Sequence, residues 1–187
     1  HFDDQLRLVV LDQGRAEFAV AHMRKPFEVR AGANTIRDIG TTFQVSKDDD
    51  AVTVGLLDGV VAVTHGDGDE AKTRTLAPDQ QIRIANDNGH ADIQPLDTQA
   101  ARAWANGELV FHQHRLDALL TEMNRYSQTK LRLGDIRLAS LKVSGSFHAG
   151  DQEALVKALE AGWSLHAEVS AEHELTLYPI STRQHMH

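Results

Sequence analysis

The chain has 187 residues and a net charge of −8 at pH 7, with 41% hydrophobic and 5% aromatic residues. This composition is typical of a folded protein of one or two domains, and the acidic balance argues against non-specific binding to nucleic acid or anionic membrane. The absence of cysteine excludes disulfides and cysteine-ligated metals. No apolar run approaches the length of a membrane span, and the first residues lack the pattern of a signal peptide.

Residues 1–93 contain short runs rich in Val, Ile, Thr and Phe between turn residues, with no helical pattern. We expect strands at Leu6–Leu11, Ala16–Ala21, Phe27–Ala31, Asn34–Ile39, Thr42–Lys47, Ala51–Leu57, Gly59–His65, Thr73–Leu76 and Gln81–Ile84. A glycine opens or precedes several runs, at Gly14, Gly40 and Gly59. Glycines at strand corners favour a solenoid-like roll or a compact sandwich, so the first domain is predicted to be all-β.

Residues 94–106 are predicted to be a linker with a short helix. Pro95 interrupts the strand pattern, and Asp97 is suited to cap a helix that carries Trp104. We expect Trp104 to pack between the two halves of the chain.

Residues 107–180 alternate strands and helices. Strands are expected at Glu108–His112, Lys130–Leu133, Leu141–Phe147, Ser164–Val169 and Glu174–Ile180. Helices are expected at Leu116–Ser127 and from an Asp151 cap to a stop at Gly162. Phe111, Leu119, Leu120 and Met123 recur at one offset as Phe147, Leu155, Val156 and Leu159. The recurrence predicts a small α/β domain of two strand-helix-strand units, and residues 181–187 are expected to be a disordered tail.

Several stretches of the sequence resemble a known family, in addition to showing these periodic patterns. They are "FDDQLRLVVLDQGRAEFAVAH", "PFEVRAG", "IGTTFQV", "VTVGLLDGVVAV", "LAPDQQ", "WANGELVFHQHRLDALLTEMNRYS" and "VSGSFHAGDQEALVKAL". In this order they resemble the periplasmic region of FecR-family anti-sigma factors, the sigma regulators of cell-surface signalling. The specificity lies in the ordered set, since no single stretch is a catalytic signature.

The resemblance implies an inner-membrane protein of a Gram-negative bacterium that crosses the membrane once. Its cytoplasmic segment would hold a sigma factor, and its periplasmic part would bind the N-terminal signalling domain of a TonB-dependent outer-membrane receptor in the regulation of iron uptake. Residues 1–93 would be an N-terminally incomplete FecR domain, and residues 107–180 would resemble a secretin/TonB short N-terminal (STN) domain. We expect the cytoplasmic segment and the transmembrane helix to lie outside this sequence, so contact with a sigma factor or membrane would occur only through them. The resemblance implies no cofactor.

In some members of that family a Gly-Thr pair in the "IGTTFQV" motif is a self-cleavage site, and here the pair is Gly40-Thr41. The threonine hydroxyl would attack the preceding carbonyl in an N-to-O acyl shift, and water would then split the ester. Glycine leaves the carbonyl open and tolerates a strained turn. His22 or Asp38 could supply the base. The alternative is a β corner in which Thr41 and Thr42 are ordinary strand residues, and both interpretations stay open.

Two strands of the second domain, Lys130–Leu133 and Leu141–Phe147, are candidate partner-binding edges, because a free edge can accept a partner's strand. The outward positions predicted to contact the partner are Arg132, Lys142, Ser144, Ser146 and His148. The alternative is that both strands are internal, since strand order is not predictable from one sequence.

His112 and His114 are two residues apart and are expected to point to one side, with His148 as a third candidate ligand. Acidic turns occur at Lys47–Asp50, Gly66–Glu70 and Asn86–Gly89. None has the spacing of a calcium loop, and we predict no metal site. The sequence shows no Gly-rich phosphate loop, nucleophile elbow or Ser-His-Asp order, so we predict no enzymatic activity beyond self-cleavage. A further alternative, an envelope carbohydrate- or metal-binding β-module, rests on the all-β first half and the histidines.

Overall fold

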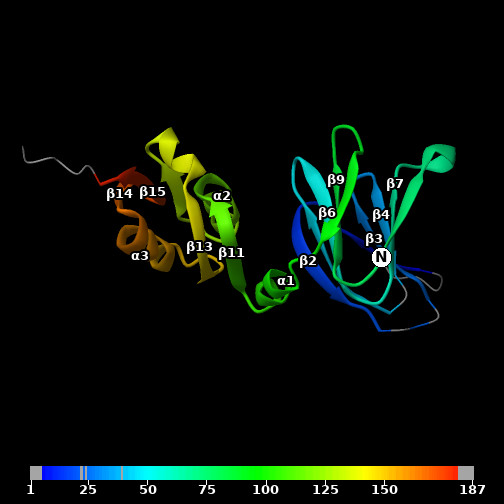
Figure 1. Cartoon of the computed structure of the whole chain (residues 1–187). Helices are drawn as coiled ribbons and strands as arrows, with labels where there is room; N and C mark the ends of the chain where they lie inside the picture. The colour runs from blue at the N-terminus through cyan, green and yellow to red at the C-terminus, as the bar shows by residue number, and fades with distance from the viewer. Residues whose placement is uncertain (1–5, 22, 24, 39, 181–187) are drawn as a thin grey trace, which may run out of the picture. The chain divides into compact units, whose positions relative to one another are not determined.

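A computed structural model of the chain describes residues 6–21, 23, 25–38 and 40–180. The predictions for His22 and for the tail at 181–187 concern residues outside that description. The protein is a strand-rich α/β structure that divides into two compact units, residues 1–101 and 102–187 (Figure 1). Each unit has its own core of buried apolar side chains.

Two five-stranded sheets build the first unit, in the orders β1-β3-β4-β7-β8 and β10-β9-β6-β5-β2. Their strands are β1 (Arg7–Val10), β2 (Gly14–Ala19), β3 (Phe27–Ala31), β4 (Asn34–Asp38), β5 (Thr42–Lys47), β6 (Ala51–Asp58), β7 (Val61–His65), β8 (Lys72–Leu76), β9 (Gln80–Ala85) and β10 (Ala91–Pro95). β1 runs parallel to β3, and the other described pairs in this unit are antiparallel. A short 3-10 turn, η1 (Gly68–Glu70), joins β7 to β8.

The apolar faces of both sheets meet in a single core. Ile36 from one sheet and Phe43, Val54 and Leu56 from the other are fully buried in it. Alternate residues of a strand point to opposite faces, so the β-branched and aromatic residues of each strand reach this core together. The arrangement corresponds to the sandwich alternative, with the sheets facing each other in Figure 1. No solenoid repeat is confirmed.

The prediction that Pro95 interrupts the strand pattern is wrong. Pro95 is the last residue of β10, a strand that the sequence pattern did not reveal. β10 pairs only with β9 among the described strands, at the edge of its sheet. An edge strand tolerates proline because half of its amide hydrogens face no neighbouring strand.

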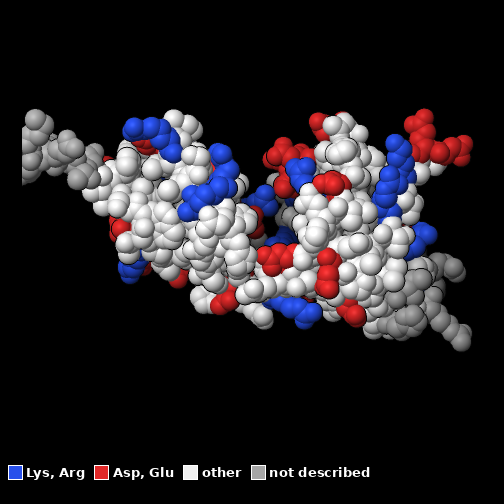
Figure 2. Space-filling model, in the orientation of Figure 1, with Lys and Arg blue, Asp and Glu red and all other residues white. Residues whose placement is uncertain are grey.

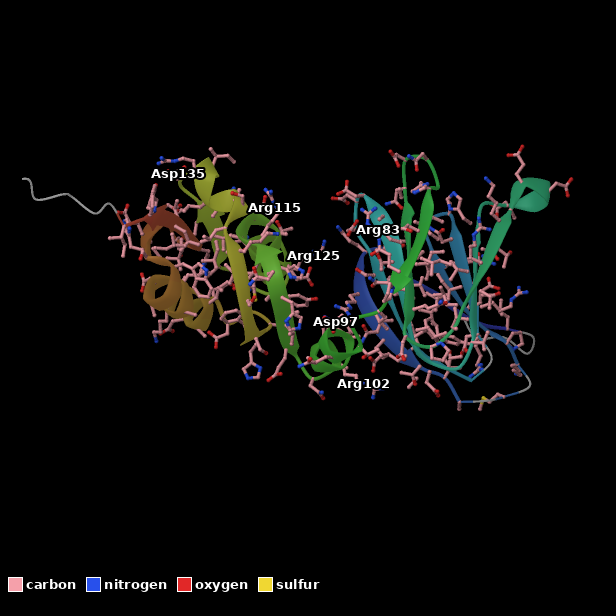
Figure 3. The ribbon with its side chains drawn as sticks, in the orientation of Figure 1. Arg83, Asp97, Arg102, Arg115, Arg125 and Asp135 are labelled. Atoms are coloured by element: carbon pink, nitrogen blue, oxygen red, sulfur yellow. The ribbon has the colours of Figure 1, made fainter. Side chains whose placement is uncertain are left out.

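Helix α1 (Thr98–Ala105) follows the first unit's last strand. Asp97, labelled in Figure 3, caps it as predicted, because its Oδ1 accepts a hydrogen bond from the Ala100 amide at 2.9 Å. The Gln44 side chain on β5 donates to the Ala101 carbonyl at 2.8 Å. The first turn of the helix is therefore held by a buried side chain of the sheet.

Two small sheets and two helices build the second unit. The elements are β11 (Glu108–Arg115), α2 (Leu116–Asn124), β12 (Lys130–Leu133), η2 (Ile136–Ser140), β13 (Lys142–His148), α3 (Gln152–Trp163), β14 (Leu165–Ala171) and β15 (Glu174–Pro179). β11 pairs with β13, and the second sheet has the order β12-β15-β14. This element order repeats strand, helix and strand as predicted, with β15 added at the end.

The apolar positions that recur in the two strand-helix-strand repeats of the second unit meet in that unit's core. Phe111, Leu119, Met123, Leu155 and Leu159 are all buried there. Amphipathic helices place such residues on one face at intervals of three and four, which explains their shared burial.

Trp104, which we expected to pack between the two halves, packs against this second core. Its Nε1 donates to the Tyr126 hydroxyl at 2.8 Å. The residue is therefore an element of the second unit's packing.

Helix α3 begins as predicted and ends later than predicted. The Asp151 carboxylate accepts a hydrogen bond from the Ala154 amide at 2.9 Å, which caps the helix start. Gly162 lies within the helix, and Ser164 takes the left-handed conformation at its end with φ of +53°. The predicted stop at Gly162 is wrong because a serine adopts the conformation that glycine usually supplies.

Candidate functional site

The corner between β4 and β5 contains the Gly40-Thr41 pair. β4 belongs to one sheet and β5 to the other, so the chain changes sheets between Asp38 and Thr42. Gly40 has φ of +80°, a conformation that residues with a Cβ rarely adopt. Glycine is thus required by the backbone at this corner.

A buried hydrogen bond joins the two ends of the corner. The Thr41 hydroxyl donates to Oδ1 of Asp38, and the two residues are 3% and 1% exposed. The second oxygen of Asp38, Oδ2, has no hydrogen-bond partner within the described part of the chain. A carboxylate that already accepts the hydroxyl hydrogen is in position to receive that proton.

Neighbouring strands hold the corner in place. The Val20 amide donates to the Thr41 carbonyl at 2.8 Å. Gly59, in the turn between β6 and β7, lies so close that a Cβ there would be 2.4 Å from Cγ2 of Thr41. The absence of a side chain at Gly59 leaves the space in which Thr41 is packed.

The sequence named His22 and Asp38 as candidate bases, and His22 lies outside the described residues. The structure brings Asp38 to the threonine hydroxyl. The sequence alone did not choose between the two candidates, because the contact forms across a turn in which Gly40 has a positive φ.

The second candidate site is the pair of predicted partner-binding strands. The predicted contact residues are all exposed, namely Lys142, Ser144, Ser146 and His148 on β13 and Arg132 on β12. Val143 on β13 and Leu131 on β12, which point to the opposite face, are buried. The predicted orientation of these residues is confirmed. Both strands lie at edges of their sheets in the described structure, so the alternative of two internal strands is wrong.

The central part of β13 has outward-facing backbone groups. The Ala149 amide donates to the Gly107 carbonyl at 2.9 Å, and bonded and non-bonded pairs alternate along antiparallel strands. The amide and carbonyl of Ser146 and His148 therefore point away from β11. The His148 carbonyl accepts from the Asp151 amide at 3.0 Å, which leaves Ser146 as the most accessible position of this edge.

Other predicted contact residues on β13 have structural partners. The Ser144 hydroxyl accepts from the backbone amide of Gln113 at 2.9 Å, at a bulge in β11 where Gln113 has φ of +52°. The Lys142 carbonyl accepts from Nε1 of Trp163 at 3.1 Å. These contacts fix the first half of β13 to the body of the unit.

The edge of β12 is closed by a side chain that sequence analysis did not identify. Asn124, at the end of α2, accepts from the Leu131 amide at 2.8 Å and donates to the Leu131 carbonyl at 2.9 Å. The Asn124 side-chain amide thus makes the two hydrogen bonds that a neighbouring strand would make. Gln152 supports it by donating to the Asn124 side-chain oxygen at 3.2 Å. A polar residue four positions after Leu120, on the apolar face of the helix, was the available signal.

Arg132 is paired on the outer face of β12. Its guanidinium donates to the Glu174 carboxylate, which also accepts from the Ser170 hydroxyl at 3.0 Å. The Arg132 hydrogen bond, followed by that of Ser170, lowers the pKa of Glu174. Arg132 is therefore an ion-pair residue as well as an exposed one.

The histidines considered as metal ligands lie toward opposite ends of β11. The bulge between Phe111 and His114 disrupts the alternation of β11, and the His112 amide donates to Nδ1 of His114 at 3.2 Å. His148 pairs with Glu108 at the other end of the strand. Within the described part of the chain, no group of three His, Cys, Asp or Glu side chains is placed to hold a metal ion.

In one acidic turn, the Asp48 carboxylate accepts hydrogen bonds from the amides of Asp50 and Ala51, as expected of a hairpin.

None of the helices among the described residues has the length and apolar character needed to cross a bilayer.

Comparisons with known proteins agree with this architecture. The model of the family described as FecR protein matches residues 1–62. Two crystal structures of a candidate anti-sigma factor from Parabacteroides distasonis are similar to 96% of this chain and 83% of theirs, at 26% identity and TM-scores of 0.75 and 0.74. No curated protein matches the sequence. The resemblance of this chain to FecR-family anti-sigma regulators is thereby confirmed.

Proposed function

We propose that this chain is the sensor part of an anti-sigma regulator. The FecR match and the likeness to the anti-sigma candidate support a sigma-regulatory role. The similarity extends over both units of the chain, which supports a function that depends on both units together. In this proposal the chain works in the periplasm as part of an inner-membrane protein. Its second unit acts as an STN-like domain that receives the signalling domain of a TonB-dependent receptor.

The free edge of β13 carries the partner-binding part of the proposal. Ser146 presents its backbone amide and carbonyl away from β11, whereas the Asn124 side chain closes the edge of β12. An added strand gains main-chain hydrogen bonds only where such groups are free. We therefore assign the receptor contact to β13, around Ser146, in preference to β12.

Calorimetric titration of the full chain with the isolated N-terminal signalling domain of the receptor tests this assignment. We expect saturable one-to-one binding. Ser146→Pro removes the edge amide hydrogen without touching a bond to β11, and it should weaken binding about tenfold or more. Ser146→Ala is the matched control, since it keeps the amide and should bind like the parent chain.

Equal affinity of the proline and alanine variants would overturn the assignment to β13. Absence of any binding by the correctly folded chain would overturn the receptor as partner. Circular dichroism of both variants separates these outcomes from loss of the fold.

The corner at Gly40-Thr41 supports self-cleavage as a second function. The observation that favours it is the buried hydrogen bond from the Thr41 hydroxyl to the Asp38 carboxylate. In this scheme Asp38 takes the hydroxyl proton as the threonine oxygen attacks the Gly40 carbonyl carbon. The carbon–nitrogen bond then breaks, and the leaving nitrogen takes the proton from Asp38. Water hydrolyses the resulting ester, which leaves a carboxylate on Gly40 and a free amine on Thr41.

Denaturing mass spectrometry of the purified chain tests cleavage. We expect two fragments that meet between Gly40 and Thr41, and none from Thr41→Ala. Asp38→Asn should slow the appearance of fragments about 100-fold or more, because it removes the proton acceptor. Thr42→Ala is the control and should be cleaved normally. A single uncut mass near 20.6 kDa after prolonged incubation would overturn self-cleavage.

A further inference from the structure

The corner that contains Gly40-Thr41 lies beside a second corner of the same kind. The chain passes from β6 in one sheet to β7 in the other through Gly59, which has φ of +90°. Two strand pairings flank these corners, β5 with β6 on one side and β4 with β7 on the other. The two corners are therefore held side by side by both sheets.

Gly59 lies against both of the groups that would react. A Cβ at Gly59 would be 2.4 Å from Cγ2 of Thr41 and 3.1 Å from the carbonyl oxygen of Gly40. Carbon atoms do not pack as closely as the first of these distances, so a side chain at this position would displace Thr41. Because its Cα carries only hydrogens, Gly59 lets the threonine methyl group and the scissile carbonyl pack against the second corner together.

The geometry of the acyl shift depends on few torsions. When the Thr41 hydroxyl oxygen attacks the Gly40 carbonyl carbon, it closes a small ring through Cβ, Cα and the nitrogen of Thr41. The distance that closes this ring is set by φ and χ1 of Thr41, because the other elements are bond lengths and angles. The rotamer of Thr41 therefore decides whether its hydroxyl can reach the carbonyl carbon.

These two torsions of Thr41 are restrained from several sides. The hydroxyl donates to the Asp38 carboxylate, and the methyl group rests against Gly59. Many carboxylates of the first unit lie on its surface (red in Figure 2), whereas Asp38 is 1% exposed. The Thr41 carbonyl accepts from the Val20 amide at 2.8 Å, which restrains φ. A β-branched side chain has few rotamers, so these contacts select one of them.

We propose that Gly59 is a positioning residue for the acyl shift at Gly40-Thr41, and this inference rests on the self-cleavage proposed above. In that shift the oxygen–carbon bond forms, the carbon–nitrogen bond breaks, and the hydroxyl proton passes through Asp38 to the nitrogen. Gly59 takes no part in these transfers. Its bare Cα supports the threonine methyl group, so that the hydroxyl stays on Asp38. It also leaves room for the carbonyl oxygen, which moves as its carbon becomes tetrahedral.

Cell-free synthesis of the full chain, sampled over time by denaturing mass spectrometry, tests the role of Gly59. Gly59→Ala should slow the appearance of the two fragments about 100-fold, because a displacement of about 1 Å at a reacting centre has an effect of that size. Gly14→Ala is the matched control, since Gly14 has φ of +95° and no atom within 4 Å of its Cβ position. It should be cut at the rate of the parent chain.

A destabilised variant separates positioning from loss of stability. Ile84 is 1% exposed in the same core and pairs with Val52, at the end of β6 that is remote from Gly59. Ile84→Ala should lower the midpoint of urea unfolding at least as much as Gly59→Ala. Its rate of cleavage should nevertheless stay within about twofold of the parent rate, because distant sites act independently.

The serine variant of the nucleophile supplies a rescue. Thr41→Ser keeps the hydroxyl and removes the methyl group that a Cβ at position 59 would meet. Adding Gly59→Ala to Thr41→Ser should slow cleavage less than about tenfold, because residues in contact do not have additive effects. Loss of stability alone would slow the threonine and serine chains equally.

Four results would overturn the role of Gly59. A parent chain that stays uncut would overturn self-cleavage itself, and this inference with it. A parent chain that is cut no faster than Gly59→Ala would overturn the role of Gly59 alone. The same holds for equal slowing by Ile84→Ala, and for equal slowing by Gly59→Ala in the threonine and serine chains. If Thr41→Ser alone is not cut, the methyl group is required, which is the result expected when its contact with Gly59 positions the hydroxyl.

Discussion

The two units differ in where they keep their polar side chains. The first unit buries Glu28, Asn34, Asp38, Thr41 and Gln44, whereas the second buries Gln152 and Thr176. In the first unit, Asp38 and Thr41 lie at the corner between the sheets, and Gln44 lies at the contact with α1. Glu28 lies beneath two surface arginines, and Asn34 binds the Ala31 carbonyl and His65. In the second, the polar positions of β13 face solvent. A buried polar group is stable only with a fixed partner, so the first unit is suited to hold one conformation and the second to meet another molecule.

The largest expected effects come from the two separate cores. Phe43→Ala should lower the stability of the first unit by about 3–5 kcal/mol, and Leu159→Ala that of the second by about 2–5 kcal/mol, since both residues are fully buried. Amide hydrogen exchange should show the loss of protection confined to the mutated unit. Equal loss of protection in both units from either substitution would mean that they unfold as one.

The packing of the Gly-Thr corner should be the next most sensitive feature. Gly59→Ala places a Cβ against Thr41 at φ of +90°, and we expect a loss of about 2–3 kcal/mol. Gly14→Ala is the matched control, because Gly14 has φ of +95° but no atom within 4 Å of its Cβ position. Its cost should be about 1 kcal/mol, from backbone strain alone. Equal costs in urea unfolding would show that the contact with Thr41 is unimportant.

In the second unit, Asn124→Ala should uncover the edge of β12. The loss of two hydrogen bonds to Leu131 should cost about 1–3 kcal/mol, and the exposed strand should increase self-association. Asn106→Ala, which removes one exposed bond to the Arg102 carbonyl, serves as control. Analytical ultracentrifugation should detect association for Asn124→Ala only. A monomeric Asn124→Ala variant would show that the side chain does not protect the edge.

The smallest effect concerns Glu174. Arg132 lowers its pKa, so the pair stabilises the fold above the ordinary carboxylate pKa and loses that contribution as the pH falls through the lowered value. Arg132→Gln should raise the pKa of Glu174, as carboxyl ¹³C shifts against pH would measure. An unchanged pKa would mean that the ion pair does not persist in solution.

Local patterns predicted much of the fold. The bounds of β3, β5 and β12 follow from their residue types and turns, and the caps at Asp97 and Asp151 from single carboxylates. Features that depend on distant contacts were not predictable. The bulge at Gln113 is held by the Ser144 hydroxyl, and the edge of β12 is closed by the Asn124 side chain.

The candidate site divides in the same way. Gly40-Thr41 was visible in the sequence, and Asp38 was one of two candidate bases. Only the folded corner brings the Asp38 carboxylate to the threonine hydroxyl. For the partner edge, alternation predicted which side chains face outward, while strand order decided which backbone groups are free.

The sheet change at Gly40 has a mechanical consequence. A chain cut after Gly40 would keep β1 to β4 in one piece and β5 to β10 in the other. The strand ladders between the pieces would be the six residue pairs of β2 with β5 and the five of β4 with β7. Such ladders resist a pull along the strands but open one pair at a time under a pull across them. The direction of an applied force would then decide whether the two pieces hold together or separate.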